Sequence, residues 1–323
     1  MVSFFRDKWA SSIFWLIMLS IGIHAHFIKN APEVITVQRD GLLYFVLEPL
    51  KSLPALARVL IYHFLILIIA IRLNYILNDL KMMQTQAFTT GMTYVMLSAL
   101  FREWNNITEP LIMHIIILWL YSKLARLYNN TNPKTLIYNI GLIAGLMMLL
   151  YYPAAILVAL CFFALLILRP FYLNELITMV LGIITPCYFL AIALFLTDHL
   201  DDISRYLPQI HFSSLNFHHQ PLYMVNLGIL LVLVLAGFSI WQRQTGRMLI
   251  QARKNWGVLL LLFLLIIPIL FVNSNEWVSV AFLSVVPVAA FGSNVFLYPR
   301  KNAVPAILFW LLTGIIVFNN WFA

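Results

Sequence analysis

The stretch WGVLLLLFLLIIPILFV, residues 256–272, decides the fold class of this chain. It carries no charged side chain and approaches the roughly 20 apolar residues that cross a bilayer as a helix. Comparable apolar runs recur from Ser11 to Phe322. Of the 323 residues, 63% are hydrophobic and 10% are charged, whereas an ordinary soluble domain has about 25% charged residues. The sequence therefore predicts an all-α polytopic membrane protein.

The sequence predicts a single transmembrane domain, residues 1–323, in which the apolar runs form eleven spans. Two of these runs, 87–101 and 153–168, are short, and we expect such helices to lie among other helices or where the bilayer is thin. The predicted spans are 11–28, 56–77, 87–101, 109–127, 135–151, 153–168, 174–197, 222–241, 256–272, 277–297 and 304–322.

Lysine and arginine are distributed unevenly over the turns between these spans. With a cytoplasmic amino terminus, fourteen of the 20 basic residues fall on the cytoplasmic side and six on the external side, as the positive-inside rule requires. Eleven spans then place the carboxyl terminus outside. Nine of the 12 acidic residues fall on the external side, and all 8 histidines lie there or in the outer halves of spans. We therefore expect the external face to be the functional one.

Two external loops are long enough to cover a site, 29–55 and 198–221. In the first, the segment LLYFVLEPL, residues 42–50, combines apolar residues with spaced polar ones and predicts a helix lying at the membrane interface. A third external segment, FREWNNITEP at 101–110, is a short charged turn between two spans. We expect this turn to face a polar cavity that it shares with the 29–55 loop.

Familiar catalytic and metal-binding signatures are absent from the sequence. It contains no GxxxxGK[ST], HExxH or GxSxG motif. His24 and His26, and the adjacent His218 and His219, are candidate metal ligands. Residues two apart face nearly opposite sides of a helix, so His24 and His26 cannot hold one ion unless the helix has ended. We expect no metal site, no other cofactor and, because the basic residues form no patch, no nucleic-acid partner. Cys161 and Cys187 both lie in apolar runs, where no disulfide is expected.

Two pairs of adjacent opposite charges are the strongest site candidates, Arg39–Asp40 and Arg102–Glu103. Sequence neighbours do not face each other on a helix, so each arginine is expected to meet a phosphate or lipid headgroup and each carboxylate to take a proton. The alternative is that these charges only fix loops at the interface. Gly41, directly after the first pair, permits a tight turn.

Three further features lie inside the predicted spans. His63 and His114 each lie one to three turns from the external boundary and need a partner or water there. They either line a wet external cavity or hydrogen-bond to a neighbouring helix. Gly141 and Gly145 form a GxxxG face, which predicts close packing against another helix.

Residues 74–190 include NDLKMMQTQAF, FREWNNITEPLIMHIIILWLYSKLARLYN and PKTLIYNIGLIAGLMMLLYYP. Their layout resembles an uncharacterised family of multipass inner-membrane proteins from Bacteroidota, in which a turn bearing Asp or Asn precedes two short spans, a basic turn, a small-residue-rich span and an aromatic break. The resemblance implies a multi-pass protein of the bacterial inner membrane and carries no established activity.

The layout is also similar, more distantly, to the C-type (GT-C) integral-membrane glycosyltransferases. In that superfamily a first span precedes a long external loop with an acidic residue and an amphipathic helix, and the following spans hold a polyprenyl-phosphate sugar donor. The matching loop here is 29–55, and Asp40 corresponds to the acidic base. This chain departs from the pattern in having Arg39 and Gly41 around Asp40, where those enzymes often carry paired acids, and in lacking a large external domain.

This similarity implies a transferase that moves a sugar from a polyprenyl-phosphate carrier to an external acceptor, with Asp40 as catalytic base. The residues expected to bind phosphate or to line the substrate cavity are Arg39, Arg102, Glu103, Arg205, His63 and His114. The alternative is a non-catalytic integral-membrane subunit of an envelope secretion, translocation or motility complex. The expected partners are accordingly the lipid bilayer, a polyprenyl-phosphate lipid and integral-membrane proteins.

Overall fold

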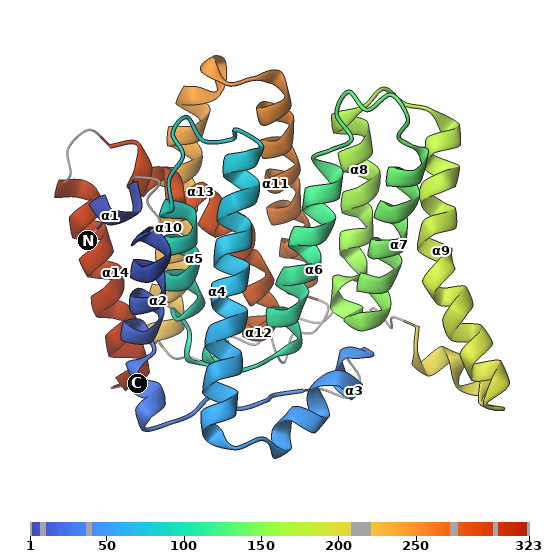
Figure 1. The fold of residues 1–323 in the computed structure, drawn as a ribbon, viewed down its shortest axis with the longest axis horizontal. Helices are drawn as coiled ribbons and strands as arrows, with labels where there is room; N and C mark the ends of the chain where they lie inside the picture. Colours follow the sequence, from blue (N-terminus) through green and yellow to red (C-terminus); the bar gives the residue numbers. More distant parts are fainter. Residues whose placement is uncertain are drawn as a thin grey trace.

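Helices that run roughly parallel or antiparallel to one another form the body of the protein (Figure 1). The computed structural model describes residues 2–6, 11–36, 41–207, 221–271, 277–299 and 303–321, and these contain no strand. The helices are α1 Ser3–Arg6, α2 Ser11–Ile23, α3 Leu43–Leu47, α4 Ala55–Asp79, α5 Thr89–Ser98, α6 Glu109–Leu124, α7 Lys134–Leu150, α8 Val158–Leu168, α9 Leu173–Leu196, α10 Pro221–Gln244, α11 Ile250–Ile269, α12 Trp277–Ala281, α13 Val285–Leu297 and α14 Ala303–Trp321.

The prediction of an all-α membrane protein is confirmed, but fewer helices have the length of a span than the sequence predicts. Within the described residues, six segments are long and apolar enough to cross a membrane: 55–79, 173–196, 222–247, 250–269, 277–297 and 303–321. The other predicted ranges contain shorter helices, because the apolar run is itself short, as in 135–151, or because part of it is not α-helical. In the 153–168 run, for example, the 3-10 segment Tyr152–Leu157 precedes the short helix α8.

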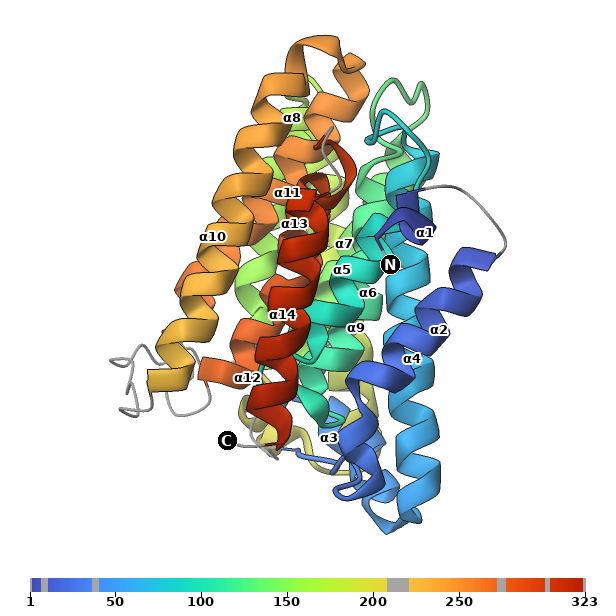
Figure 2. The same ribbon diagram turned by 90° about the vertical axis from the view of Figure 1, so that its left-hand side faces the viewer.

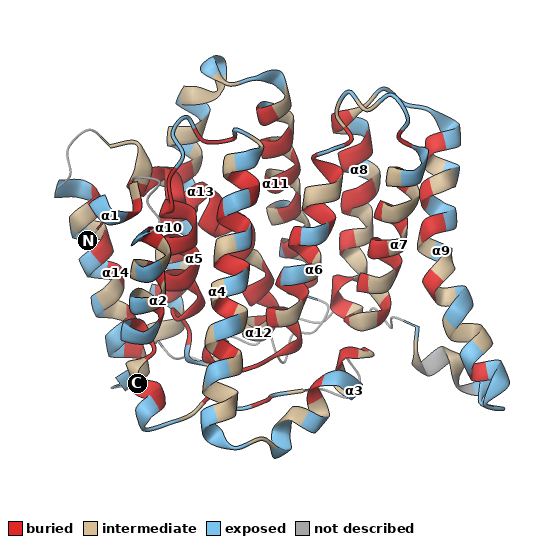
Figure 3. Ribbon diagram, viewed as in Figure 1, coloured by how far each residue is buried: buried red, intermediate tan, exposed pale blue. Residues whose placement is uncertain are grey.

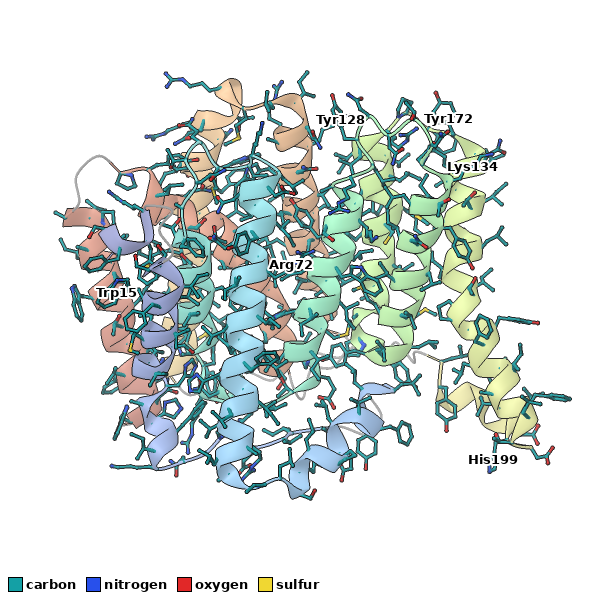
Figure 4. All side chains as sticks on the ribbon, in the orientation of Figure 1. Trp15, Arg72, Tyr128, Lys134, Tyr172 and His199 are labelled. Carbon is teal, nitrogen blue, oxygen red and sulfur yellow. The ribbon has the colours of Figure 1, made fainter. Side chains whose placement is uncertain are left out.

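The two ends of the bundle are distinguished by the small helix α3. This helix and the 3-10 segment Glu48–Ser52 lie across the end at which α4 and α6 begin, here called the α3 end (Figures 1 and 2). Both elements fall in the loop for which the sequence predicts an interfacial helix. The other end, called the opposite end, carries the turns after α4, α6 and α8. Figure 4 shows Lys134 and Tyr172 at the opposite end, far from His199.

The centre of the bundle is occupied by α5 and by α12–α13. All ten residues of α5 are buried, and every residue of α13 except Leu297 is buried (Figure 3). Such a helix is enclosed on all sides, so it need not reach both surfaces of a bilayer. The expectation that the short 87–101 helix lies among other helices is therefore confirmed.

Close packing of α7 against α9 depends on three glycines. A Cβ atom on Gly141 would lie 2.2 Å from the carbonyl oxygen of Met179, and one on Gly145 would lie 2.4 Å from that of Ile183. Gly182 of α9 has the reciprocal position, 2.4 Å from the carbonyl oxygen of Tyr138. The predicted GxxxG packing face is confirmed, with Gly182 as the partner that the motif does not reveal.

Candidate functional site

The charged turn Arg102–Asn105 lies at the α3 end and is fastened there by Trp104. This indole is buried, donates from Nε1 to the carbonyl oxygen of Val278 at 2.7 Å, and stacks on Phe282 with 5.1 Å between ring centroids. Tyr62 of α4 donates its hydroxyl to the carbonyl oxygen of Trp104 at 3.1 Å. The turn is thus held between α4 and the α12–α13 region. These contacts fix the backbone that carries the neighbouring polar side chains.

Asparagines from α10 and α14 bind the carbonyl groups just after α5. Asn319 donates to the carbonyl oxygen of Leu100 at 2.9 Å and to the side chain of Asn226 at 2.9 Å. Asn320 donates to the carbonyl oxygen of Ala99 at 3.0 Å and accepts from Asn105 at 2.7 Å. A helix that ends inside a membrane protein leaves carbonyl groups without intrahelical donors, and these amides supply them.

The segment after α2 pairs with the other side of the charged turn. The backbone amide of Ile107 donates to the carbonyl oxygen of Glu33 at 2.8 Å, and that of Ile35 donates to the carbonyl oxygen of Ile107 at 3.1 Å. Asn106 adds a side-chain contact, since its Oδ1 accepts from the backbone amide of Glu33 at 3.0 Å. The turn and the first part of the 29–55 loop are therefore joined, although about 70 residues separate them in sequence.

A cavity of about 500 Å³, which we call the cationic cavity, lies where these segments meet. Three of its lining side chains carry a permanent positive charge, Lys29, Arg58 and Arg102, against a single carboxylate, Glu33. It is further lined by His26, Phe27, Asn30, Ala31, Pro32, Asn105, Asn106 and Asn320. Because cations outnumber carboxylates and amides surround them, the cavity suits an anion that also bears hydroxyl groups.

Several polar atoms at the cationic cavity are buried without a hydrogen-bond partner among the described residues. They are Nδ1 of His26, Nε of Arg58 and Oδ1 of Asn105. An unsatisfied buried polar atom costs free energy, so such atoms normally have a protein, water or ligand partner. Their concentration around one cavity points to a polar ligand or bound water there.

A second cavity of about 390 Å³, which we call the carboxylate cavity, lies on the other side of the charged turn. Arg102 and Asn106 line both cavities, and the second is further lined by Phe101, Glu103, Leu222, Tyr223, Asn226 and Asn319. Tyr223 donates its hydroxyl to Oε1 of Glu103, while Oε2 of the same carboxylate is buried without a partner. The second oxygen of Glu103 is therefore able to accept a hydrogen bond from a ligand.

His63 lies next to the cationic cavity without lining it. Its Nδ1 is 2.9 Å from Oγ of Ser20, and its ring centroid is 5.5 Å from that of His24. His24 in turn donates from Nδ1 to the carbonyl oxygen of Ser20 at 2.8 Å. This group supports the helix pair from which His26 and Arg58 reach the cavity. Among the described residues, no three His, Cys, Asp or Glu side chains converge as metal ligands.

His114 occupies the interior and lines neither of the two cavities. It is fully buried, its Nδ1 lies 2.7 Å from the hydroxyl of Tyr94, and its Nε2 lies 2.9 Å from the carbonyl oxygen of Phe282. Both ring nitrogens thus have protein partners on other elements. This is the arrangement expected of a histidine that joins helices rather than of one that faces a wet cavity.

The remaining predicted site residues lie at the margins of what the structure describes. Arg39 and Asp40 lie outside the described residues, and for Arg205 only the backbone is described, in a 3-10 turn after α9. Gly41, which the sequence suggests permits a tight turn, has φ +139°, and a Cβ there would lie 2.3 Å from the carbonyl oxygen of Leu150, so only glycine fits this position.

The 29–55 loop, which contains Arg39 and Asp40, has internal side-chain contacts. Thr36 donates to Glu48 at 3.1 Å, and Lys51 contacts the same carboxylate at 2.6 Å. The hydrogen bond from Lys51 holds the pKa of Glu48 below its usual value. Thr36, Glu48 and Gly41 line neither cavity.

Sequence reasoning missed several residues that build the two cavities. Arg58 lies near the start of the predicted span 56–77 and belongs to no motif. The same is true of four residues inside later predicted spans, Tyr223, Asn226, Asn319 and Asn320. The signal that could have found the last two is the pair of adjacent amides in FNNW, residues 318–321, within an otherwise apolar run. In a bilayer, side-chain amides need partners, so such a pair indicates a polar contact between helices.

No family model, no curated protein and no solved structure matches this chain.

Proposed function

We propose that this protein is a transferase of the bacterial inner membrane that uses a polyprenyl-phosphate-linked sugar as donor at the α3 end, which faces the periplasm. The observation that carries the proposal is the cationic cavity, where Lys29, Arg58 and Arg102 oppose a single carboxylate. Its volume of about 500 Å³ falls within the range of about 300–1,000 Å³ typical of small-molecule sites.

The donor is held by its phosphate and by its lipid chain. Arg58 and Arg102 provide guanidinium groups that match phosphate oxygens, and the surrounding asparagines suit the sugar hydroxyls. Ile61 and Leu65, which follow Arg58 on the same face of α4 and are partly exposed, offer an apolar surface along which a polyprenyl chain can lie. A phosphate at this depth with an apolar chain beside it matches the chemistry of a membrane-anchored donor.

The acceptor is placed in the carboxylate cavity. In the proposed transfer, an acceptor hydroxyl attacks the anomeric carbon, the bond from that carbon to the phosphate oxygen breaks, and the polyprenyl phosphate leaves with the electron pair. The hydroxyl proton passes to a carboxylate. That carboxylate is Asp40, the base that the resemblance to GT-C enzymes implies, while Glu103 accepts a hydrogen bond from a second hydroxyl of the acceptor and so orients it. Arg102, which lines both cavities, stabilises the departing phosphate.

The orientation that belongs to this proposal has the amino terminus in the cytoplasm, eleven spans and the carboxyl terminus outside. It is supported by the placement of charges in the fold. Nine described basic residues lie in or beside the turns of the opposite end, namely Lys81, Lys123, Arg126, Lys134, Arg169, Arg243, Arg247, Arg253 and Lys254. A basic end of this kind is typical of the cytoplasmic side.

Native mass spectrometry of the protein, extracted in mild detergent from its own membrane, tests the proposal by weighing bound lipids and bound proteins together. We expect a polyprenyl phosphate or its glycosylated form on the native chain, and its loss in the double variant Arg58→Gln/Arg102→Gln. Lys51→Gln is the matched control, because Lys51 is a cation of the same end that lines neither cavity.

Absence of any polyprenyl lipid from the native protein would overturn the donor assignment. Stoichiometric protein partners in its place would favour the alternative, a non-catalytic subunit of an envelope secretion, translocation or motility complex.

A further inference from the structure

A separate polar cavity lies at the opposite end of the molecule, between α4 and α6. It has a volume of about 260 Å³ and is lined by Arg72, Tyr75, Ile76, Asp79, Leu80, Ser122 and Arg126. On α4, Arg72 follows Arg58 by 14 residues, which corresponds to about 21 Å along a helix. Figure 4 shows Arg72 in the upper half of α4, away from the α3 end. This cavity is therefore distinct from the proposed transferase site.

The two arginines of this cavity lack protein partners among the described residues. Neither the Arg72 side chain nor the Arg126 side chain makes a hydrogen bond or ion pair there, and Asp79, although it lines the cavity, pairs with neither. Arg169 at the same end shows the contrast. It pairs with Glu175 at 3.1 Å and donates to the carbonyl oxygens of Leu127 and Asn130 at 3.2 and 2.7 Å. Arg169 therefore stabilises the turns of this end, whereas the guanidinium groups of Arg72 and Arg126 remain available to bind a ligand.

The depth of Arg72 sharpens this argument. Arg72 lies seven residues before the end of α4, about 10 Å along the helix axis, in a helix long and apolar enough to span a bilayer. An ionised side chain inside a span requires a counter-charge or a path to the headgroup layer. Arg126, in the turn after α6, approaches the same cavity from beyond the helix end. Both side chains line one cavity close to the end of α4, on the side of the opposite end.

Below the arginines, both helices present apolar side chains outward. Ile68 on α4 is 42% exposed, and Ile115 and Trp119 on α6 are 38% and 46% exposed. The two guanidinium groups lie nearer the end of the helices than these apolar side chains. This arrangement is complementary to a phospholipid, whose phosphate would contact the arginines and whose acyl chains would contact the apolar side chains. Basic pockets between transmembrane helices on the cytoplasmic side bind anionic headgroups in this way.

We propose that the α4–α6 cavity binds an anionic phospholipid of the leaflet at the opposite end, with Arg72 and Arg126 on its phosphate and its acyl chains along Ile68 and Trp119. Two arginines and Asp79 sum to one positive charge, which a singly charged lipid such as phosphatidylglycerol neutralises and a zwitterionic lipid does not. The Asp79 carboxylate accepts a hydrogen bond from a headgroup hydroxyl, as the glycerol of phosphatidylglycerol provides.

The test is native mass spectrometry of the full-length protein titrated with phosphatidylglycerol or with phosphatidylethanolamine in the same detergent. We expect phosphatidylglycerol to remain bound under activation that removes phosphatidylethanolamine. We expect its retention to fall about tenfold in each of Arg72→Gln and Arg126→Gln, since each removes a charge-assisted contact. Arg253→Gln is the matched control, because Arg253 is exposed at the same end and lines no part of this cavity.

Three outcomes would overturn the proposal: equal retention of both lipids, unchanged retention of phosphatidylglycerol in both Arg72→Gln and Arg126→Gln, or displacement of the bound lipid by inorganic phosphate as effective as that by added lipid. The last would assign the same arginines to a free phosphate. Arg126→Gln keeps the test decisive if Arg72→Gln fails to fold, because Arg126 lies in an exposed turn outside the helix.

Discussion

At the scale of single residues, the adjacent charged side chains Arg102 and Glu103 line different cavities in part. Arg102 lines both cavities at the α3 end, whereas Glu103 lines only one and shares its carboxylate with Tyr223. The sequence predicts that the two adjacent charges contact groups other than each other. Glu103 agrees with this prediction, because its carboxylate accepts a hydrogen bond from Tyr223. A carboxylate with one bonded and one unpartnered oxygen is oriented and still able to bind a ligand.

The first prediction concerns the carboxylates of the proposed transfer. We expect Glu103→Gln to retain bound polyprenyl-phosphate sugar but to slow its consumption, and Asp40→Asn to do the same if Asp40 is the base, each by about 10²–10⁴-fold. The measurement is loss of radiolabelled sugar from a synthetic polyprenyl-phosphate sugar in membranes that contain each variant and the native acceptor. Unchanged transfer in Asp40→Asn would remove Asp40 from the mechanism.

A second prediction concerns His114, whose role the structure sets apart from the cavities. His114→Leu leaves the hydroxyl of Tyr94 and the carbonyl oxygen of Phe282 buried without their partner. We expect it to lower the free energy of unfolding by about 1–3 kcal/mol. His199→Leu is the control and should change little, because His199 is exposed. Thermal unfolding in detergent measures both, and equal midpoints would contradict a structural role for His114.

At the scale of elements, the short helix α5 shows how polar contacts let a helix end inside the protein. It is too short to span a bilayer, and the carbonyl groups that follow it are bound by asparagines of α10 and α14. Those amides are the same ones that line the cavities beside the charged turn. The structural requirement of ending α5 therefore brings polar side chains to the site.

A third prediction tests the α7–α9 contact with glycines that share the same helix propensity. Gly145→Ala places a Cβ 2.4 Å from the carbonyl oxygen of Ile183, so we expect a loss of about 1–3 kcal/mol from forced separation of the helices. Gly314→Ala meets no atom within 4 Å and should be neutral or stabilising by up to about 1 kcal/mol. Thermal unfolding midpoints that move in the same direction would contradict this account of the packing.

At the scale of the whole molecule, the two ends carry different chemistry. The opposite end gathers most of the described lysines and arginines, whereas the α3 end carries the two cavities with fewer cations, several carboxylates, and His24, His26 and His63. A bilayer separates these ends by its hydrocarbon thickness of about 30 Å. The protein therefore has room for one proposed site in each leaflet, a donor site at the α3 end and a phospholipid site at the opposite end.

The fourth prediction fixes which end faces the cytoplasm. In a background without Cys161 and Cys187, we expect a membrane-impermeant maleimide to label Ser52→Cys in intact spheroplasts and to label Lys134→Cys only after lysis. Both positions are exposed, and they lie at opposite ends. The reverse pattern would invert the orientation and would move the cationic cavity to the cytoplasmic face.

Much of the fold could be read from local patterns in the sequence. Uncharged runs such as 256–272 predict helices in a membrane, because lipid offers no partner for backbone groups and a helix satisfies them internally. The spacing of Gly141 and Gly145 likewise predicts a close helix contact, and Gly41 indicates that a tight turn is permitted. Each of these predictions depends only on the residues of one short segment, because the hydrogen bonding, packing or turn that it concerns is local to that segment.

The site itself was decided only by the tertiary structure. Lys29, Arg58, Arg102 and Asn320 come from four distant segments, and only the packing of α2, α4 and α14 around α5 brings them to one cavity. The same packing keeps both His63 and His114 out of the two cavities, although each lies at a similar depth in its predicted span. Composition and periodicity report which solvent a segment prefers, whereas the cavity depends on which helices touch, and that is settled by side-chain shape and by buried polar groups finding partners.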